Sequence, residues 1–216
     1  MEKMKFVKIT KPHLRYMKSR NFNEIADYLH RNPLIAWLFW KRLKTMLNLS
    51  KPAKRVLDFG SGSGVFLPSL SRNFVEVYAF DLDIESLEYV KKTYNLENVK
   101  IIKGVRGKNR LPYKNNFFDI IFAADVLEHF KDSLKIQEEF KRILKINGSL
   151  IVSGPTENFL YRLVRKYIYR QRKPKDHYTD IFDVMNKSKR LFKIEKIIIL
   201  PCPLIPGFKI YRAKKV

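Results

Sequence analysis

The sequence predicts an α/β fold built on a doubly wound, mostly parallel sheet. The middle of the chain alternates short apolar runs with longer amphipathic stretches, which is the pattern of strands joined by helical crossovers. A glycine-rich turn follows the first apolar run and opens a helical stretch. The length of 216 residues and the hydrophobic content of 45% fit one globular domain with a small addition.

Five strands and three helices are expected in this middle part. The strands are placed at 55–59, 75–80, 99–103, 118–123 and 149–153, and the helices at 65–74, 84–94 and 133–146. The last helix should stop at Asn147-Gly148, because this pair favours a turn. Buried apolar strands joined by crossovers indicate parallel neighbours.

Beyond Pro155 the pattern changes to a basic amphipathic stretch. We expect helices at about 156–173 and 181–191, followed by strands at 193–200 and 208–213. The link 201–207 holds three prolines and one glycine, which predicts a rigid turn between two antiparallel strands. An antiparallel C-terminal strand then completes a sheet of about seven strands.

The N-terminal part reads as a separate helical segment. A helix is expected over 23–49 with a break at Asn32-Pro33. We therefore divide the chain into a basic N-terminal cap, 1–54, and a domain, 55–216, that carries a basic helical insertion at about 156–192.

The charge is concentrated at the two ends of the chain. Lys and Arg number 44 against 21 Asp and Glu, a formal net charge of +23. Residues 1–55 and 154–216 each carry +11, whereas 56–153 carry +1. Two basic arms favour a large anionic partner, and the alternative is a solvated, Lys-rich surface.

Membrane insertion and secretion are not indicated. The longest apolar run, 34–40, is far shorter than the about 20 residues that span a bilayer, and no apolar signal core follows the basic N-terminus. The lone cysteine, Cys202, excludes an internal disulfide and an all-thiolate zinc site. We expect a cytoplasmic protein without a transmembrane span.

The glycine-rich turn is the most informative segment. It reads Val56-Leu57-Asp58-Phe59-Gly60-Ser61-Gly62-Ser63-Gly64. Such a turn lets a ligand approach the backbone, and the helix that follows attracts an anionic end of that ligand. A dinucleotide fingerprint would need Gly or Ala in place of Val65, and no Lys-Ser/Thr pair follows for a P-loop. Asp58 would repel a diphosphate but can accept hydrogen bonds from a cationic amine.

This acidic residue followed by x-Gly-x-Gly-x-Gly resembles the first motif of the class I S-adenosylmethionine-dependent methyltransferases, which have a Rossmann-like fold. Asp81 follows 23 residues later at the end of the second strand. Three further segments are similar to the type 11 branch of that family, namely Leu111-Pro112-Tyr113 with 117–122, Asp125-Val126-Leu127-Glu128-His129-Phe130, and 144–152. The resemblance covers about 100 residues, 55–155.

The resemblance implies S-adenosyl-L-methionine as the cofactor. The loop amides would hold its methionine carboxylate, and Asp81 would accept both ribose hydroxyls. The implied cofactor-binding residues are Asp58, Phe59, Gly60, Ser61, Gly62, Gly64, Asp81, Leu82, Val105 and Ala124. One departure is Gly104-Val105, where the family usually has Gly-Asp to read the adenine amino group. Adenine is then expected to be read by the backbone or by stacking.

Asp125 and His129 are the expected catalytic residues. They follow the fourth strand, at the sheet edge where ligands collect in open parallel sheets, and His129 can act as a general base near neutral pH. The alternative is that Glu128 and His129 open a helix and pack against the cofactor. A metal held by Asp125, Glu128 and His129 is a weak possibility because all three lie on one turn, and no metal is expected.

The segment after Pro155 points to the acceptor. Residues 159–170 wind into a helix with an apolar half and a basic half, and 162–175 hold seven basic and no acidic residues. Such a helix suits an anionic membrane surface, which favours a lipid, isoprenoid or lipid-linked substrate. In the alternative reading the apolar half packs on the sheet and the charges are solvated.

RNA is the rival partner. The basic arms carry Tyr16, Tyr161, Tyr167 and Tyr169, which can stack on bases. The Asp125-Val126-Leu127-Glu128 segment differs from the Asn-Pro-Pro-aromatic motif of nucleic-acid amino methyltransferases, and Cys202 lies far from the nucleophile position of pyrimidine C5 enzymes. Other RNA methylation stays open, as does a non-catalytic module that binds membranes or nucleic acid.

Overall fold

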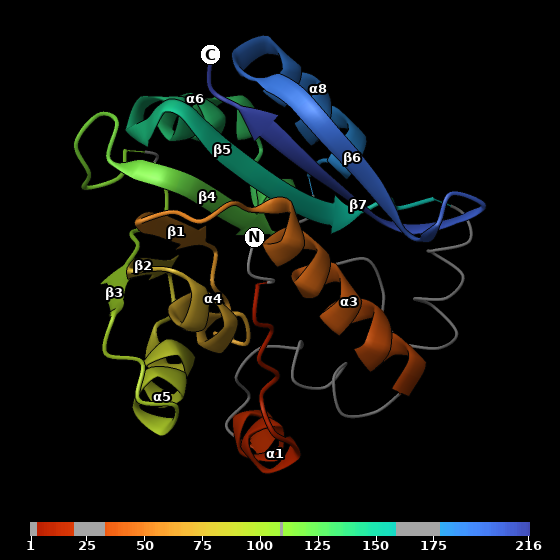
Figure 1. Ribbon diagram of the computed structural model, residues 1–216. Coiled ribbons are helices and arrows are strands. Elements are labelled where there is room, and N and C mark those ends of the chain that lie inside the picture. The colour runs from red at the N-terminus through yellow and green to blue at the C-terminus, as the bar shows by residue number, and fades with distance from the viewer. Residues whose placement is uncertain (1–3, 20–32, 109, 159–177) are drawn as a thin grey trace. The chain divides into compact units, whose positions relative to one another are not determined.

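The computed structural model describes residues 4–19, 33–108, 110–158 and 178–216 (Figure 1). The chain divides into two compact units, Met1–Lys108 and Asn109–Val216, which we describe separately. Within the described residues, no helix has both the length and the apolar character that crossing a bilayer requires.

The first unit contains three parallel strands with helices between them. In chain order its elements are α1 (Lys11–Ser19), α3 (Pro33–Leu49), β1 (Arg55–Phe59), α4 (Leu67–Asn73), β2 (Glu76–Asp81), α5 (Glu85–Thr93) and β3 (Val99–Lys103). The strand order is β3-β2-β1, and Asp58 pairs with Ala79 while Phe59 pairs with Phe80. The glycine turn and the end of β2 therefore lie at the same edge of this half-sheet. The predicted bounds of β1 and β3 are confirmed.

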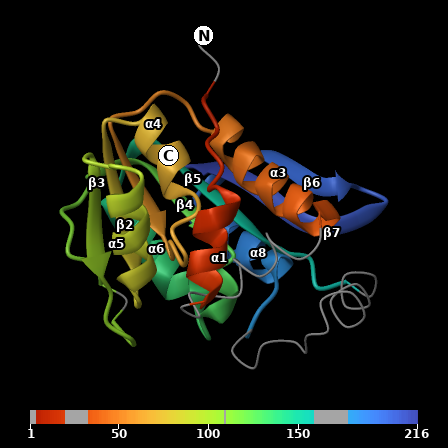
Figure 2. The same cartoon turned by 90° about the horizontal axis from the view of Figure 1, so that it is seen from below.

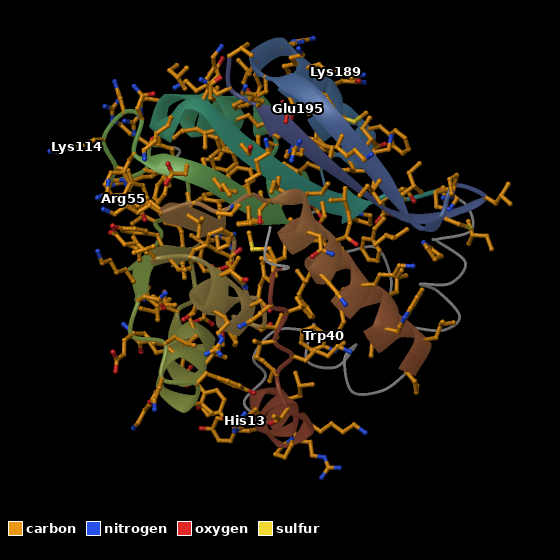
Figure 3. The ribbon with its side chains drawn as sticks, in the orientation of Figure 1. His13, Trp40, Arg55, Lys114, Lys189 and Glu195 are labelled. Carbon is orange, nitrogen blue, oxygen red and sulfur yellow. The ribbon has the colours of Figure 1, made fainter. Side chains whose placement is uncertain are left out.

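The helix α1 was not predicted. Its sequence is short and mostly polar, but its side chains contact α5 and the residue that follows it: His13 Nδ1 lies 2.8 Å from the Tyr94 hydroxyl, and the Tyr16 ring stacks on Tyr89 at 4.4 Å. Both helices can be followed in Figure 2, and Figure 3 labels His13. Tertiary contacts of this kind stabilise a nine-residue helix that would be marginal alone.

The helix predicted over 23–49 is described only from Pro33 onward. There it forms α3, and a proline at the first helical position suits a helix start because its missing N–H would have no partner. The first part of that prediction, up to residue 32, lies outside the described residues.

The second unit contains two parallel strands and an antiparallel hairpin. Its elements are β4 (Phe118–Ala124), the 3₁₀-helix η1 (Leu127–His129), α6 (Ser133–Ile143), β5 (Leu144–Pro155), α8 (Ile181–Leu191), β6 (Lys193–Cys202) and β7 (Ile205–Lys214). The order is β4-β5-β7-β6, with β7 antiparallel to both of its neighbours. With three parallel strands in the first unit, this confirms the predicted Rossmann-like class, a mostly parallel sheet with an antiparallel C-terminal strand.

One predicted turn lies within a strand, and another is shorter than expected. The helix expected to reach residue 146 ends at Ile143, and β5 runs through Asn147-Gly148. This stretch is stabilised by hydrogen bonds from Asn147 N to Lys215 O and from Lys215 N to Gly148 O, both 3.0 Å. The proline-rich link is also shorter than predicted, because Pro201 pairs with Pro206 and the strands extend to Cys202 and Ile205. The helix predicted for 156–173 lies mostly outside the described residues.

A buried polar network joins α6, α8 and β7. The Ser188 hydroxyl donates to Gln137 Oε1 and lies 2.6 Å from the Tyr211 hydroxyl, while Gln137 Nε2 donates to Val184 O. Ser188, Gln137 and Tyr211 are fully buried. Because buried hydroxyls need hydrogen-bond partners, this network fixes the position of α8 against α6 and β7.

Candidate functional site

The glycine turn of the first unit is shaped by its own backbone hydrogen bonds. Gly60 N and Ser61 N donate to Phe80 O at 2.8 and 3.1 Å, and Gly64 N donates to Ser61 O at 2.9 Å. Gly60, Gly62 and Gly64 have φ of 71°, 53° and 72°, in the left-handed region that favours glycine. The amides that were expected to hold a carboxylate thus already have acceptors within the chain at Gly60, Ser61 and Gly64.

Asp81 braces the same turn from the end of β2. Its Oδ2 accepts from Gly62 N at 2.7 Å, and its Oδ1 accepts from Asp83 N at 3.2 Å. A carboxylate has about four lone-pair sites, so these two bonds leave capacity for further donors. Asp81 therefore shapes the turn, and its expected role toward a ribose stays a prediction.

Asp58 is the most unusual group of this turn. The residue is 2% exposed, and its Oδ2 atom has no hydrogen-bond partner among the described residues. Burial, with a smaller contribution from the charge of Asp81, raises the pKa of Asp58 to about 7. A buried carboxylate oxygen without a partner fits a ligand that brings a cation and hydrogen-bond donors.

Ser63 is a site residue that the sequence reasoning missed. It is fully buried, and its hydroxyl, like Asp58 Oδ2, has no hydrogen-bond partner in the described part of the chain. The only sequence signal was its place inside the glycine turn. Two unsatisfied polar atoms in one turn strengthen the case for a ligand there, since nearly all buried polar groups are satisfied.

The ends of β2 and β3 are apolar. Leu82 and Val105 are 44% and 57% exposed. Gly104 N donates to Asp81 O at 2.7 Å, and a Cβ at position 104 would come within 2.7 Å of the Phe80 ring. This close approach explains Gly104, and Val105 offers an apolar surface where the family usually has a carboxylate.

In the second unit, β4 ends in a strained residue. Asp125 directly follows Ala124 and has φ of 50°, a left-handed conformation that costs energy for a residue other than glycine. Asp125 N donates to Ser153 O at 3.0 Å, and Asp125 Oδ1 accepts from the Ser153 hydroxyl at 3.2 Å. Ser153, another residue that the sequence reasoning missed, thus holds the predicted catalytic carboxylate.

Glu128 and His129 lie in a short turn. They belong to the three-residue 3₁₀-helix η1, Leu127–His129, so the helix of the alternative reading is a single short turn that ends at His129. Glu128 O accepts hydrogen bonds from Tyr178 N at 2.9 Å and Thr179 N at 3.4 Å, which ties this turn to the segment before α8. His129 is half-buried. No group of three or more His, Cys, Asp or Glu suited to a metal ion occurs among the described residues.

The structure groups the predicted site residues within each unit. In the first unit the predicted residues lie at or just after the carboxyl ends of the neighbouring parallel strands β1, β2 and β3, namely Asp58, Phe59, Gly60, Ser61, Gly62, Gly64, Asp81, Leu82 and Val105. Phe59 itself stacks on Phe80 at 5.2 Å. In the second unit Ala124 ends β4, and Asp125 and His129 lie in the segment that follows it.

The fold matches that of a known class of enzyme. The N-methyltransferase NodS from Bradyrhizobium japonicum, solved in complex with S-adenosyl-L-homocysteine, aligns with a TM-score of 0.69 and 13% identity, over 94% of this chain and 98% of that one. At this identity the likeness concerns the fold alone. This fold is the one that class I S-adenosylmethionine-dependent methyltransferases have, and the acidic residue and three glycines after β1 stand where their first motif does.

The sequence comparisons identify the branch. Residues 57–152 match the family model described as a methyltransferase domain, so this segment of the chain is a type 11 methyltransferase domain, of the class that uses S-adenosyl-L-methionine. An uncharacterised protein of Methanocaldococcus jannaschii is 34% identical over 157 residues, which are 67% of this chain and 64% of that protein. The mitochondrial ubiquinone biosynthesis O-methyltransferase of Schizosaccharomyces pombe is 29% identical over 158 residues, 67% of this chain and 57% of that enzyme. The chain thus spans less than two thirds of the length of both relatives.

Proposed function

We propose that this chain transfers the methyl group of S-adenosyl-L-methionine to a small-molecule or lipid acceptor. The observation that carries the proposal is the unpartnered oxygen of the buried Asp58 carboxyl group at the glycine turn. When bound, the cofactor supplies a methyl group on a positively charged sulfur. The acceptor would bond to the methyl carbon from the side opposite the sulfur, which leaves as a neutral thioether. The work left to the protein is mainly alignment, which supplies much of the rate of such reactions.

The first unit would hold the cofactor. Asp58 accepts hydrogen bonds from its cationic amino group, and the Ser63 hydroxyl offers a second polar contact. Asp81 keeps its bond to Gly62 N and accepts the ribose hydroxyls through its remaining lone pairs. Leu82 and Val105 provide apolar contact for adenine, which supports reading by stacking.

Titration with S-adenosyl-L-homocysteine tests this arrangement. Asp58→Asn and Asp81→Ala should each weaken binding at pH 7.5 at least several-fold. Glu97→Gln, which removes an exposed charge from the same unit, should bind like the wild type. Unchanged affinity in Asp58→Asn would overturn the proposal, because Asp58 Oδ2 would then not bind the ligand.

The catalytic roles follow from the segment after β4. We assign His129 as the general base that removes a proton from the acceptor, and Asp125 as the carboxylate that faces the acceptor from a fixed backbone. His129→Gln should lower kcat at least tenfold and leave the affinity for S-adenosyl-L-homocysteine unchanged. An equal loss of kcat and of cofactor affinity would favour the alternative, in which His129 packs against the cofactor.

The acceptor is assigned to lipids or lipid-like molecules on two grounds. Seven basic residues between 162 and 175 suit an anionic membrane surface, and one relative is named for ubiquinone biosynthesis. We place the protein in the cytoplasm with peripheral contact to the membrane. Flotation with anionic vesicles at two salt concentrations, beside RNA retention at the same salts, tests this assignment.

Charge reversal separates the possible partners. Vesicle binding should fall when Arg162, Arg165 and Lys166 are changed to Glu, and persistence of binding would overturn the membrane assignment. RNA retention with a steep salt dependence would favour RNA as the partner. Transfer of labelled methyl to a lipid extract, but not to RNA, is the expected result, and no transfer to either would favour the non-catalytic alternative.

We also propose the domain organisation given by the sequence. In this division 1–54 form a basic cap, and 55–216 form the methyltransferase domain with an insertion at about 156–192. The bond between Thr10 N and the Tyr94 hydroxyl, 2.9 Å, supports the attachment of the cap to α5. Deleting 1–19 should leave a folded protein and change the KM for the acceptor; an unchanged KM would contradict a cap.

A further inference from the structure

Two lysines of the C-terminal segment are buried, but only one of them has acceptors. Lys215, 8% exposed, donates from Nζ to Asn116 Oδ1 at 2.9 Å and to Leu144 O at 2.7 Å. Lys209, 7% exposed, has no hydrogen bond or ion pair among the described residues. Its Nζ lies 3.7 Å from the centroid of the Phe182 ring. Lys209 Nζ is not among the fully buried side-chain atoms that lack a partner, so this amine keeps contact with solvent and can be reached by an anion that the described residues do not supply.

The groups around Lys209 do not supply that anion. Asp180 attracts it, but Asp180 Oδ1 caps α8 by accepting from Phe182 N and Asp183 N, both at 2.9 Å. Lys189, labelled on α8 in Figure 3, repels it. Burial and this repulsion lower the pKa of Lys209. An anionic ligand beside Lys209 would offset both burial and the repulsion by Lys189, and so raise the pKa of Lys209 again.

Lys209 lies at the end of the sheet where the acceptor is expected. It pairs with Gly154 of β5, and the preceding residue, Ser153, binds Asp125 through both its carbonyl and its hydroxyl. One strand, β5, separates Asp125 from Lys209, so their backbones are about 10 Å apart by the usual spacing of strands. This separation matches the size of a small organic acceptor.

Half-exposed aromatic rings lie beside this cation. Phe182 is 42% exposed and Tyr178 is 50% exposed, and Lys131 Nζ lies 5.5 Å from the centroid of the Tyr178 ring. Tyr178 N donates to Glu128 O, which joins these rings to the turn that holds His129. An apolar or aromatic body can contact the rings while an anionic group reaches the amine.

We propose that Lys209 binds an anionic group, phosphate or carboxylate, of an amphiphilic acceptor whose apolar body contacts Phe182 and Tyr178. The inference rests on the proposed methyl transfer and deepens it, because it defines the chemical class of the acceptor. Lys209 acts here as a binding residue and takes no part in moving a proton.

The test uses the full chain and small probes of defined chemistry. Calorimetry measures the binding of four probes, which are phenyl phosphate, benzoate, inorganic phosphate and neutral benzyl alcohol. Each probe is titrated into the wild type and into three variants, Lys209→Met, Lys209→Arg and Lys193→Met. Lys193 is an exposed lysine of β6, so its variant loses the same charge outside the proposed site. Thermal unfolding of each variant confirms that it is folded.

We expect phenyl phosphate or benzoate to bind the wild type and Lys193→Met equally, and to bind Lys209→Met at least tenfold more weakly. Lys209→Arg should keep most of the affinity, which a purely structural role would not predict. The preferred anion identifies the group, and benzyl alcohol should not bind. Equal affinity of all variants, or no binding of either anionic probe to the wild type, overturns the proposal.

Two further results separate this inference from its premise. Inorganic phosphate that binds as tightly as phenyl phosphate would overturn the assignment of an organic acceptor. S-adenosyl-L-homocysteine should bind Lys209→Met like the wild type. If the wild type fails to bind that compound, the proposed function falls, whatever the probes show at Lys209.

Discussion

Replacing Asp58 by Asn should stabilise the free protein at pH 8 and at the same time weaken its cofactor binding. Asp58 is buried, and its pKa is raised from the ordinary value of 3.8 to about 7. Below pH 4 the carboxyl group is neutral in both the folded and the unfolded chain, so it carries no ionisation cost. As the pH rises toward 7, ionisation of the unfolded chain is favoured over that of the folded chain, and stability is lost.

The size of the effect follows from this shift. One pKa unit corresponds to about 1.4 kcal/mol, so a shift of about three units costs the wild type about 4 kcal/mol at pH 8. Asn is neutral at every pH and avoids this cost. Its buried amide lacks partners, which subtracts about 1–3 kcal/mol from the gain at every pH.

Urea unfolding between pH 4 and 8 measures the difference. The free energy of unfolding of Asp58→Asn minus that of the wild type should rise with pH by about 1.4 kcal/mol per unit up to pH 7 and then level off. Glu97→Gln should show no such slope. A difference that does not change with pH would refute the reasoning, because the buried carboxyl group would then not govern stability. At one fixed concentration of S-adenosyl-L-homocysteine, the wild type should be stabilised more than Asp58→Asn.

Three more predictions concern the same two units. The affinity for S-adenosyl-L-homocysteine should fall up to tenfold per pH unit below pH 7, because Asp58 must be ionised to accept the amine; calorimetry that shows equal affinity at pH 5.5 and 7.5 would contradict this. Gly104→Ala should lower the free energy of unfolding by about 1–3 kcal/mol, since the new Cβ would lie 2.7 Å from the Phe80 ring. The control is Gly107→Asn, which should be nearly neutral, because nothing lies near a Cβ at this position and Asn tolerates its φ of 83° better than other residues do. Tyr211→Phe should cost about 1–2 kcal/mol by removing a hydroxyl from the Ser188 network, and a cost near zero by urea unfolding would mean that the network does not stabilise α8.

The strands could be predicted where burial alone decides them. The apolar runs at 55–59 and 99–103 have the bounds of β1 and β3, and 181–191 has those of α8, whose Asp180 caps the helix start. The prediction failed at Asn147-Gly148, where a local turn preference competes with hydrogen bonds to Lys215, 67 or more residues away in sequence. Local patterns cannot report such distant partners.

The site was predictable to the extent that its chemistry lies in one turn. The three glycines after Asp58 carry the resemblance that implies the cofactor, and such a motif can be found in the sequence because all of its residues lie in one turn. Ser153 and Lys209 escaped notice, since a single serine or lysine in a strand carries no pattern. Their positions matter only through the pairing of β5 with β4 and β7.

Two charged groups of the described residues, one in each unit, have no partner of opposite charge and differ in sign. Asp58 offers a carboxylate oxygen without a donor, and Lys209 offers an ammonium group without an acceptor. Each lowers the stability of the free protein, so each is best explained by a ligand that restores it, a cationic amine for Asp58 and an anion for Lys209. The double variant Asp58→Asn, Lys209→Met should therefore be at least as stable as the wild type at pH 8 while binding both ligands more weakly. A double variant that unfolds more easily than both single variants would show that these charges serve the fold instead of the ligands.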